Sequence, residues 1–279
     1  MRETSHLIHE YLRSSESFPH IWCPGCGNGI LLGALIRAID RGGYGKDDIV
    51  LISGIGCSGR LPTYVDFNTL HTTHGRALTF ATGIKLVKPT LKVIAVMGDG
   101  DAIAIGGNHF IHAARRNVDI TAIIINNQTY GMTGGQFSPT TPFGNITSSS
   151  PYGHLETPFN ICRLAEAAGA VFVGRSTVYH TRLLEKVIGK ALHKEGFSVV
   201  EVISQCPTHF GKQIGIESPV EMMKIQRDNA ISVEKGRDLS EKELERKIVI
   251  GVLVDREVPA YDKEHERLIT RIRAKGNAL

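Results

Sequence analysis

The chain carries two short polar motifs whose residue types could bind a metal ion and a phosphate group. Gly98-Asp99-Gly100-Asp101 follows the apolar run 92–97, and Asn126-Asn127 ends the apolar run 120–126. Such runs are typical of buried strands in a parallel sheet, and residues 103–116 between them have a helical pattern. Neighbouring parallel strands end at one edge of the sheet, where such sheets bind ligands. The carboxylate of Asp99 and the amide oxygen of Asn127 would therefore suit a small hard cation that also binds phosphate oxygens.

The cysteines form a second set of residues that could hold a metal. Cys23 and Cys26 are a Cys-X-X-Cys pair, whereas Cys57 and Cys206 follow the strand-like runs 49–53 and 198–203. One edge of a parallel sheet could therefore bring Cys57 and Cys206 together. Four thiolates can hold zinc or an iron–sulfur cluster, and a redox disulfide of the close pair is a third possibility. Spacing alone leaves these alternatives open.

We predict no chemical role for the remaining cysteine or for three of the lysines. Cys162 lies inside a helical pattern, and we expect it to pack in the core as a small apolar residue. We interpret Lys85, Lys88 and Lys92 as surface charges.

Strand-like and helical patterns alternate along the chain, which indicates an α/β fold with a doubly wound parallel sheet. The predicted strands are 49–53, 92–97, 120–126, 170–174 and 198–203, and the predicted helices are 29–40, 75–87, 103–116, 159–168 and 178–193. The segment 131–152 is rich in Gly, Thr, Pro and Ser and is too long to be only a connector. We expect it to be a functional loop.

The composition changes near residue 216. Residues 221–247 are charged and helical, residues 248–254 are apolar and strand-like, and residues 261–279 are mostly charged. We therefore expect a main domain of residues 1–215 and a C-terminal extension of residues 216–279 that packs on it.

Length and charge limit the class of protein. The chain has 279 residues and a formal charge of +4, which allows one large domain or two small ones and does not indicate nucleic-acid binding. No apolar run approaches the roughly 20 residues that span a bilayer, and residues 1–17 lack the apolar centre of a secretory signal. We expect a cytoplasmic protein with neither a nucleic-acid nor a membrane partner.

The Gly-Asp-Gly motif, the 25 residues after it and the Asn pair resemble the motif of thiamine diphosphate enzymes. The resemblance implies the diphosphate-domain fold of that superfamily. It also implies that Asp99, Asn127 and the carbonyl of Thr129 hold Mg²⁺ on the diphosphate.

Together with the cysteines, this motif resembles the β subunit of the 2-oxoacid:ferredoxin oxidoreductases. The similar stretches are 22–27, 54–58, 71–77, 106–109, 130–136 and 206–207. The resemblance implies a [4Fe–4S] cluster bound by Cys23, Cys26, Cys57 and Cys206. It implies thiamine contacts at Ile55, Gly56, Cys57, Ser58, Gly100, Asp101, Gly131 and Met132. His74, which precedes a predicted helix, could only cap that helix, but the resemblance favours a catalytic position for it, and Met132 would pack against the thiazolium or the substrate.

The resemblance also implies an activity. Such an enzyme decarboxylates a 2-oxoacid oxidatively, passes the acyl group to coenzyme A and passes the electrons to ferredoxin. The stretches 130–136 and 138–142 look more like the 2-oxoglutarate branch than the pyruvate branch, and branched-chain 2-oxoacids are a further alternative. A non-oxidative thiamine decarboxylase and a zinc-stabilised assembly subunit are rival functions.

A second polypeptide is expected. Thiamine enzymes need a pyrimidine-binding domain, and this chain has room only for the diphosphate domain and its extension. The family supplies the missing domain as an α subunit or a fused γα subunit. We therefore expect the isolated chain to be inactive.

Overall fold

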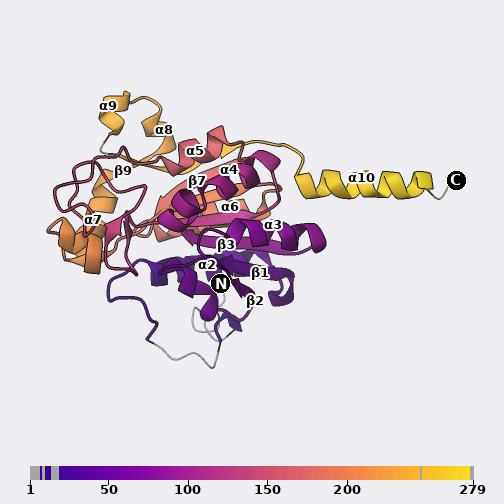
Figure 1. The fold of residues 1–279 in the computed structure, drawn as a ribbon, viewed down its shortest axis with the longest axis horizontal. Coiled ribbons are helices and arrows are strands. Elements are labelled where there is room, and N and C mark those ends of the chain that lie inside the picture. The colour runs from indigo at the N-terminus through magenta and orange to yellow at the C-terminus, as the bar shows by residue number, and fades with distance from the viewer. Residues whose placement is uncertain (1–6, 8–9, 14–18, 246, 277–279) are drawn as a thin grey trace.

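Figure 1 shows the fold in a computed structural model, which describes residues 7, 10–13, 19–245 and 247–276. Most of residues 1–17, on which the prediction about a secretory signal rests, lies outside the described residues. An eight-stranded sheet runs through the molecule in the order β2-β1-β3-β4-β8-β7-β10-β9. Its strands are β1 (Ile49–Ser53), β2 (Asn68–His71), β3 (Lys92–Gly98), β4 (Thr121–Asn126), β7 (Phe172–Thr177), β8 (Ser198–Ile203), β9 (Ala230–Ser232) and β10 (Ile248–Asp255).

The pairing within the sheet is parallel from β2 to β7. Strand β10 then joins β7 in the antiparallel direction, and β9 pairs with β10 in parallel. The predicted parallel α/β fold is therefore confirmed, with an antiparallel addition at one edge. A small hairpin of β5 (Thr129–Tyr130) and β6 (Gln136–Phe137) lies outside this sheet.

Helices cover both faces of the sheet because successive strand residues point to opposite sides. One face packs against α2 (Asn28–Gly42) and α6 (Thr181–His193), and the other packs against α3 (Ala77–Val87), α4 (Gly107–Arg116) and α5 (Ile161–Ala167). Strand β3 contributes Ile94 and Val96 to the first core and Val93, Ala95 and Met97 to the second. A strand buried on both sides must be apolar throughout, which is the pattern seen in the sequence.

Predicted and observed boundaries agree best where apolar runs are continuous, at β1 and β8. Strand β7 begins two residues later than predicted. Helix α4 also begins late, because Gly100–Ile105 form a separate π-helical turn after β3. Strand β2 was not predicted, since it lies at the sheet edge and its residues Asn68–His71 are exposed or half-buried. Without an apolar face, its sequence gives no strand signal.

One lysine prediction was wrong. Lys85 is buried, and its Nζ lies 2.6 Å from a carboxylate oxygen of Asp119. Its Nζ also donates to the carbonyl of Leu91 at 3.1 Å. These two acceptors allow a charged group to be buried beneath helix α3.

The C-terminal residues add both strands and helices to the main fold. Helices α7 (Pro219–Asn229), α8 (Val233–Gly236) and α9 (Glu241–Leu244) precede β10, and α10 (Tyr261–Gly276) projects away from the body in Figure 1. The boundary that we drew between residues 215 and 216 stays a prediction. Among the described residues, no helix is long and apolar enough to cross a membrane.

Phe110 anchors α4 in the second core, and we expect its removal to be costly. Its side chain is 0% exposed and meets Phe197 edge-on, with ring centroids 5.9 Å apart. Phe110→Ala should lower the free energy of unfolding by about 3–5 kcal/mol, as measured by urea denaturation, because it leaves a cavity. Phe80 on α3 is 46% exposed, so Phe80→Ala is the matched control and should change little. Equal losses in the two variants would contradict this assignment of the core.

Candidate active site

Four neighbouring strands deliver the predicted site to one edge of the sheet. Cys57 follows β1, Asp99 follows β3, Asn127 follows β4 and Cys206 follows β8. Helix α2 leads into β1, so it begins at the same edge, and the segment of Cys23 and Cys26 directly precedes it. The chain order of these elements is thus sufficient to gather residues that lie far apart in the sequence.

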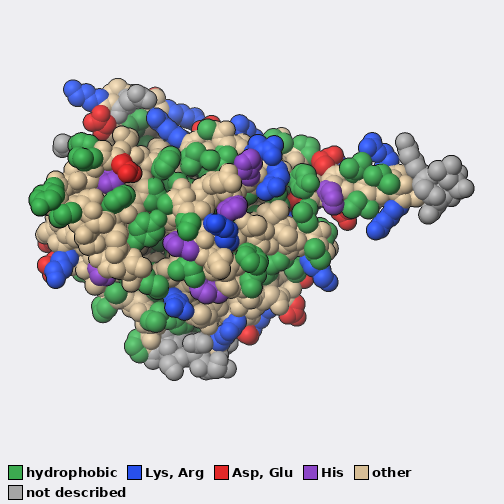
Figure 2. All heavy atoms as spheres, viewed as in Figure 1, with side chains coloured by type: hydrophobic (Ala, Val, Ile, Leu, Met, Phe, Trp, Pro, Cys, Tyr) green, Lys and Arg blue, Asp and Glu red, His purple; other side chains and the backbone are tan. Residues whose placement is uncertain are grey.

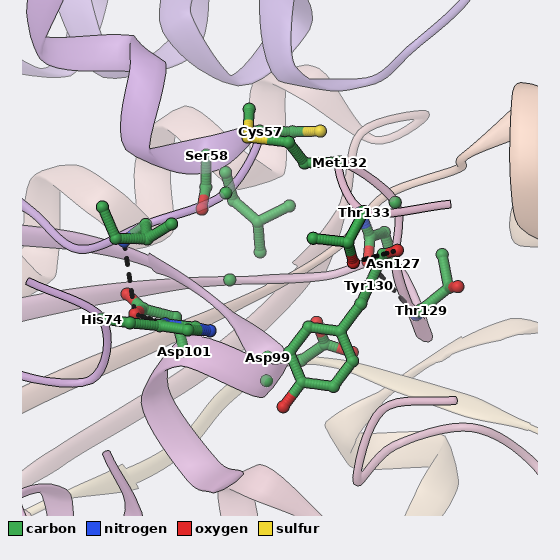
Figure 3. Close-up of a pocket in the computed structure, with 16 residues that line it drawn as sticks. Cys57, Ser58, His74, Asp99, Asp101, Asn127, Thr129, Tyr130, Met132 and Thr133 are labelled. Carbon is green, nitrogen blue, oxygen red and sulfur yellow. Dashed lines mark hydrogen bonds and ion pairs between the residues drawn. The ribbon is translucent and has the colours of Figure 1, made fainter. Parts of the chain in front are cut away.

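A pocket at this edge contains all the residues predicted to contact thiamine or magnesium. It is lined by Ile55, Gly56, Cys57, Ser58, His74, Gly98, Asp99, Gly100, Asp101, Ile125, Asn127, Thr129, Tyr130, Gly131, Met132 and Thr133. Figure 3 shows Cys57 and Met132 at one end of the pocket, with His74 and Asp101 along one side and Asn127 and Thr129 along the other. The individual roles of these residues stay predictions.

Asp99 is buried at the base of the pocket and is held by two hydroxyl groups. Its Oδ2 accepts hydrogen bonds from Ser138 Oγ at 2.7 Å and from Thr140 Oγ1 at 2.5 Å. Burial raises the pKa of the Asp99 carboxyl, although these hydrogen bonds oppose the shift. The hydroxyls fix the rotation of the carboxylate, so its position does not depend on a ligand.

Asn127 and Thr129 lie in a tight turn beside Asp99. The backbone N–H of Thr129 donates to Oδ1 of Asn127 at 3.3 Å, and Gln128 between them has a φ of +62°. A positive φ is uncommon for a residue other than glycine and occurs often at functional sites. The turn keeps the predicted side-chain and carbonyl ligands of the metal on the pocket wall.

A buried polar network supports Asp99 from behind. Arg175 on β7 donates from Nε to Glu201 Oε2 at 2.7 Å, and Asn126 donates from Nδ2 to Glu201 Oε1 at 2.8 Å. Oγ1 of Thr140 lies 2.9 Å from Asn126 Oδ1, which continues the network to Asp99. Cys162 is buried as predicted, but its thiol also donates to Glu201, at 3.1 Å. A single ion pair between strands therefore connects to the predicted metal ligand.

His74 and Asp101 form a second pair in the pocket. His74 Nδ1 lies 2.5 Å from Asp101 Oδ1, and the same oxygen accepts from the backbone N–H groups of Gly75 at 2.7 Å and Ile55 at 3.3 Å. Gly54 leaves room for this carboxylate, since an added Cβ would lie 2.0 Å from Asp101 Oδ2. With Nδ1 facing Asp101, His74 has Nε2 left to meet a ligand.

A second pocket brings the four predicted cysteine ligands together. Its lining comprises Ile21, Trp22, Cys23, Cys26, Cys57, Arg60, Asn127, Gly131, Met132, Cys206, Pro207, Thr208 and His209. Cys23 and Cys26 lie at the two ends of a tight turn, in which the N–H of Cys26 donates to the carbonyl of Cys23 at 3.0 Å and Gly25 has a φ of +78°. Proline second and glycine third are the residues that a type II turn requires.

The four thiols lie close enough to affect one another electrostatically. Burial, with smaller contributions from the neighbouring Cys206, Cys57 and Cys23, raises the pKa of Cys26 to about 12, while a backbone hydrogen bond opposes the shift. Gly131 lies beside two of the sulfurs, since a Cβ added there would be 3.4 Å from Cys206 Sγ and 3.9 Å from Cys57 Sγ. In the described part of the chain, no group of three or more His, Cys, Asp or Glu side chains is arranged to hold a metal ion.

The two pockets share one wall. Cys57, Asn127, Gly131 and Met132 line both of them. Groups bound in the two pockets would therefore be separated by little more than this wall. Met132 is 45% exposed on it, so its side chain is accessible to a ligand.

The sequence analysis missed three residues that shape the pocket. Ser138 and Thr140 come from the long loop predicted to be functional, but their stretch was used to argue for a substrate, whereas they hold Asp99. Tyr130 packs so closely on the strand end that a Cβ at Gly100 would lie 2.2 Å from its ring. The density of hydroxyl residues in 138–141 was the available signal, since loops rarely bury such side chains without a buried partner.

Comparison with known proteins gives a family match over more than half of the chain. Residues 54–202 match the family model described as thiamine pyrophosphate enzyme, C-terminal TPP binding domain. This range contains the complete first pocket and confirms the diphosphate-domain fold.

Several relatives match two thirds of the chain or more. The 2-oxoglutarate synthase subunit KorB of Methanocaldococcus jannaschii is 46% identical over 97% of this chain and 100% of its own length. The subunit KorB of Archaeoglobus fulgidus is 58% identical over 79% of this chain and 80% of its own. The 2-oxoacid:ferredoxin oxidoreductase subunit beta of Saccharolobus solfataricus is 46% identical over 67% of this chain and 62% of its own.

A solved structure is similar in three dimensions as well. It is 2-oxoglutarate:ferredoxin oxidoreductase from Magnetococcus marinus with 2-oxoglutarate, coenzyme A and succinyl-CoA bound. The match has a TM-score of 0.84 and 32% identity, and covers 95% of this chain and 90% of that one.

We expect Glu201 to stabilise the fold as an ionised group. Burial by itself raises the pKa of Glu201, but the Arg175 guanidinium and hydrogen bonds from Asn126 and Cys162 hold it below its usual value. Glu201→Gln leaves Arg175 buried without its counter-charge and should lower the free energy of unfolding by about 3–5 kcal/mol at neutral pH. A lowered pKa contributes stability that is present above the unfolded pKa and is lost as pH falls through the folded pKa.

The difference between wild type and Glu201→Gln should therefore shrink as the solution is acidified through the lowered pKa of Glu201. Urea denaturation at a series of pH values measures it. Glu257 forms an exposed ion pair with Lys194, so Glu257→Gln is the control and should have little effect at any pH. A pH-independent loss in Glu201→Gln would show that the charge of Glu201 does not stabilise the fold.

Proposed function

Since the chain belongs to the β subunits of the 2-oxoacid:ferredoxin oxidoreductases, we propose that it binds thiamine diphosphate, Mg²⁺ and a [4Fe–4S] cluster side by side. The enzyme would convert a 2-oxoacid to its acyl-coenzyme A with release of CO₂, and would pass the electrons to ferredoxin. The observation that carries the proposal is the wall of Cys57, Asn127, Gly131 and Met132 that the two pockets share.

The first pocket fits a diphosphate held through magnesium. Asp99, Asn127 and the carbonyl of Thr129 would be the protein ligands of the ion, and carboxylate, amide and carbonyl oxygens are the donors that Mg²⁺ accepts. Ser138 and Thr140 would keep the Asp99 carboxylate oriented toward the ion. Residues Ile55–Ser58, Gly100, Asp101, Gly131 and Met132 would contact the rest of the cofactor.

The second pocket fits an iron–sulfur cluster. In a [4Fe–4S] cluster each thiolate binds a different iron atom, so the four thiols surround the group and need not converge on one point. Cys23, Cys26, Cys57 and Cys206 all line this pocket, which supports the proposal. Reduced thiols of this kind are typical of the cytoplasm, which is where we place the protein.

When bound, thiamine supplies the carbanion chemistry that removes CO₂ from a 2-oxoacid, and the cluster accepts electrons one at a time. The chain's own residues would position the substrate and exchange protons with it. Asp101 orients the His74 ring through Nδ1, so that Nε2 would face the substrate and could exchange a proton with it. Met132 would supply an apolar surface where the two pockets meet.

We propose 2-oxoglutarate as the preferred substrate. The support is the names of the relatives, which are 2-oxoglutarate synthase subunits, and the similar structure with 2-oxoglutarate and succinyl-CoA bound. Pyruvate and branched-chain 2-oxoacids remain the alternatives to be measured against it.

An α subunit is the partner that a β subunit implies, and its pyrimidine-binding domain would complete the thiamine site. The long loop beside the site and the residues just after it expose large apolar side chains, at Phe143, Ile146, Tyr152 and Leu155. Figure 2 shows hydrophobic side chains at the end of the molecule where this loop lies in Figure 1, as well as elsewhere on the same face. Apolar surface of this kind marks an interface with another protein. Ferredoxin would be the electron acceptor, and the fused γα form of the partner is equally compatible.

The visible spectrum tests the cluster most directly. Anaerobically purified protein should be brown, should bleach with dithionite and should contain about four iron atoms per chain. Cys206→Ser should lose most of this absorbance, because it removes one of the four ligands. Cys162→Ala should keep it, since Cys162 lies in the core away from the second pocket. A colourless protein with bound zinc, or with no metal, would instead support the assembly or non-oxidative functions.

Activity should require both subunits and should discriminate among 2-oxoacids. The purified chain alone should not reduce ferredoxin, whereas the complex with its α subunit should do so when coenzyme A and a 2-oxoacid are present. Comparison of kcat/KM for 2-oxoglutarate, pyruvate and 2-oxoisovalerate should favour 2-oxoglutarate by about tenfold or more, a difference of about 1.4 kcal/mol. Turnover by the single subunit, or a preference for pyruvate, would contradict the respective part of the proposal.

A further inference from the structure

Helix α7 of the C-terminal extension packs directly on the turn that carries Cys23 and Cys26. Pro219, the first residue of α7, lies so close to Gly25 that an added Cβ at Gly25 would be 2.3 Å from its Cγ. Gly25 also has a positive φ of +78°, so both backbone and space at this turn require glycine. The turn is therefore enclosed by a segment nearly two hundred residues further along the chain.

Two buried glutamines connect α7 to the same turn. Gln226 of α7 is 5% exposed and Gln205, the residue before Cys206, is 3% exposed. Gln226 Nε2 donates to Gln205 Oε1 at 2.9 Å, and Gln205 Nε2 donates to the carbonyl of Gly25 at 2.9 Å. The backbone N–H of Tyr179 donates to Gln226 Oε1 at 3.3 Å and so begins the chain of hydrogen bonds.

These three hydrogen bonds, from Tyr179 through Gln226 and Gln205 to Gly25, form a relay. The direction of each bond in the relay is fixed by the bond before it. Tyr179 offers a donor, so Gln226 must turn its oxygen toward it and its nitrogen toward Gln205. Gln205 must then accept through its oxygen, which leaves its nitrogen for the Gly25 carbonyl. Reversing either amide would place two donors or two acceptors together in a buried site. The relay thus selects one orientation of the Gln205 side chain.

We infer that Gln205 and Gln226, with Pro219, are positioning residues that fix the Cys23–Cys26 turn against the segment of Cys206. The inference rests on the proposed function and deepens it. Gln205 joins two separate ligand segments, because its backbone leads into Cys206 while its side chain holds the turn. The glutamines touch neither the thiamine pocket nor a thiol, so they act through the placement of the cysteines.

Three variants separate the hydrogen bonds of the relay. Gln226→Leu removes both the acceptor for Tyr179 and the donor to Gln205. Gln226→Glu keeps the acceptor for Tyr179 but loses the donor to Gln205, and Gln205→Glu loses the final donor to Gly25. Ile250→Ala is the control, because Ile250 is buried in β10 of the same extension and lies outside the relay. It tests whether a general loss of stability is sufficient to produce the effect.

The test uses the full chain in complex with its α subunit, purified without oxygen. All three glutamine variants should acquire the cluster, but their visible absorbance should bleach in air at least about fivefold faster than that of wild type, as expected when a hydrogen bond of about 1 kcal/mol is lost. The electron paramagnetic resonance signal of the reduced cluster should also change in shape. Ile250→Ala should match wild type in both measurements, even though its unfolding midpoint in urea falls.

A second readout does not need the cluster. In the iron-free chain, alkylation of Cys23 and Cys26 by iodoacetamide, followed by mass spectrometry, should be faster in the glutamine variants than in wild type and Ile250→Ala. If the glutamine variants were alkylated faster and wild type never acquired a cluster, the positioning role would be upheld and the proposed cofactor would be refuted. Wild-type rates and spectra in all three variants would overturn the inference, as would equal effects in Ile250→Ala.

Discussion

The site depends on one geometric constraint, which is that parallel strands end together. Strands β1, β3, β4 and β8 are consecutive in the sheet and buried on both faces, so their register is fixed by two separate cores. Cysteine, aspartate and asparagine therefore reach one edge because their strands end there. The sheet, rather than the loops, brings the two pockets together, and the loops only determine what lines them.

Polar groups behind the edge add a second layer of order. The pair of Arg175 and Glu201 lies between strands, where an unpaired charge would be costly, and it is compensated by Asn126 and Cys162. The same amide contacts Thr140, so a bond within the sheet also restrains the loop that holds Asp99. Beside the cysteines, the side-chain amides of Gln205 and Gln226 are the buried groups that connect to the turn by hydrogen bonds. Each pocket is thus supported by buried hydrogen bonds that involve no bound group.

The apolar runs were sufficient to predict the central parallel strands and the meeting of their terminal residues at a common edge. The other residues of the two pockets were predicted from the resemblance to the family. The sequence was not sufficient for contacts that depend on where a loop returns. Ser138 and Thr140 meet Asp99 some forty residues away in the chain, and no local pattern encodes that distance. Lys85 was wrongly placed at the surface, since its partner Asp119 lies after the next helix. Strand β2 went unseen because an edge strand needs no apolar face.

Gly131 has a consequence of its own for the proposed enzyme. It lies beside the sulfurs of Cys57 and Cys206 and also lines the first pocket. At this point the partition between the pockets is a bare peptide plane, the thinnest insulating layer that a polypeptide can provide. A side chain here would begin in van der Waals contact with both sulfurs and would extend this partition. In the proposed enzyme, the absence of a side chain at this one position would thus allow the two cofactors to lie close to each other.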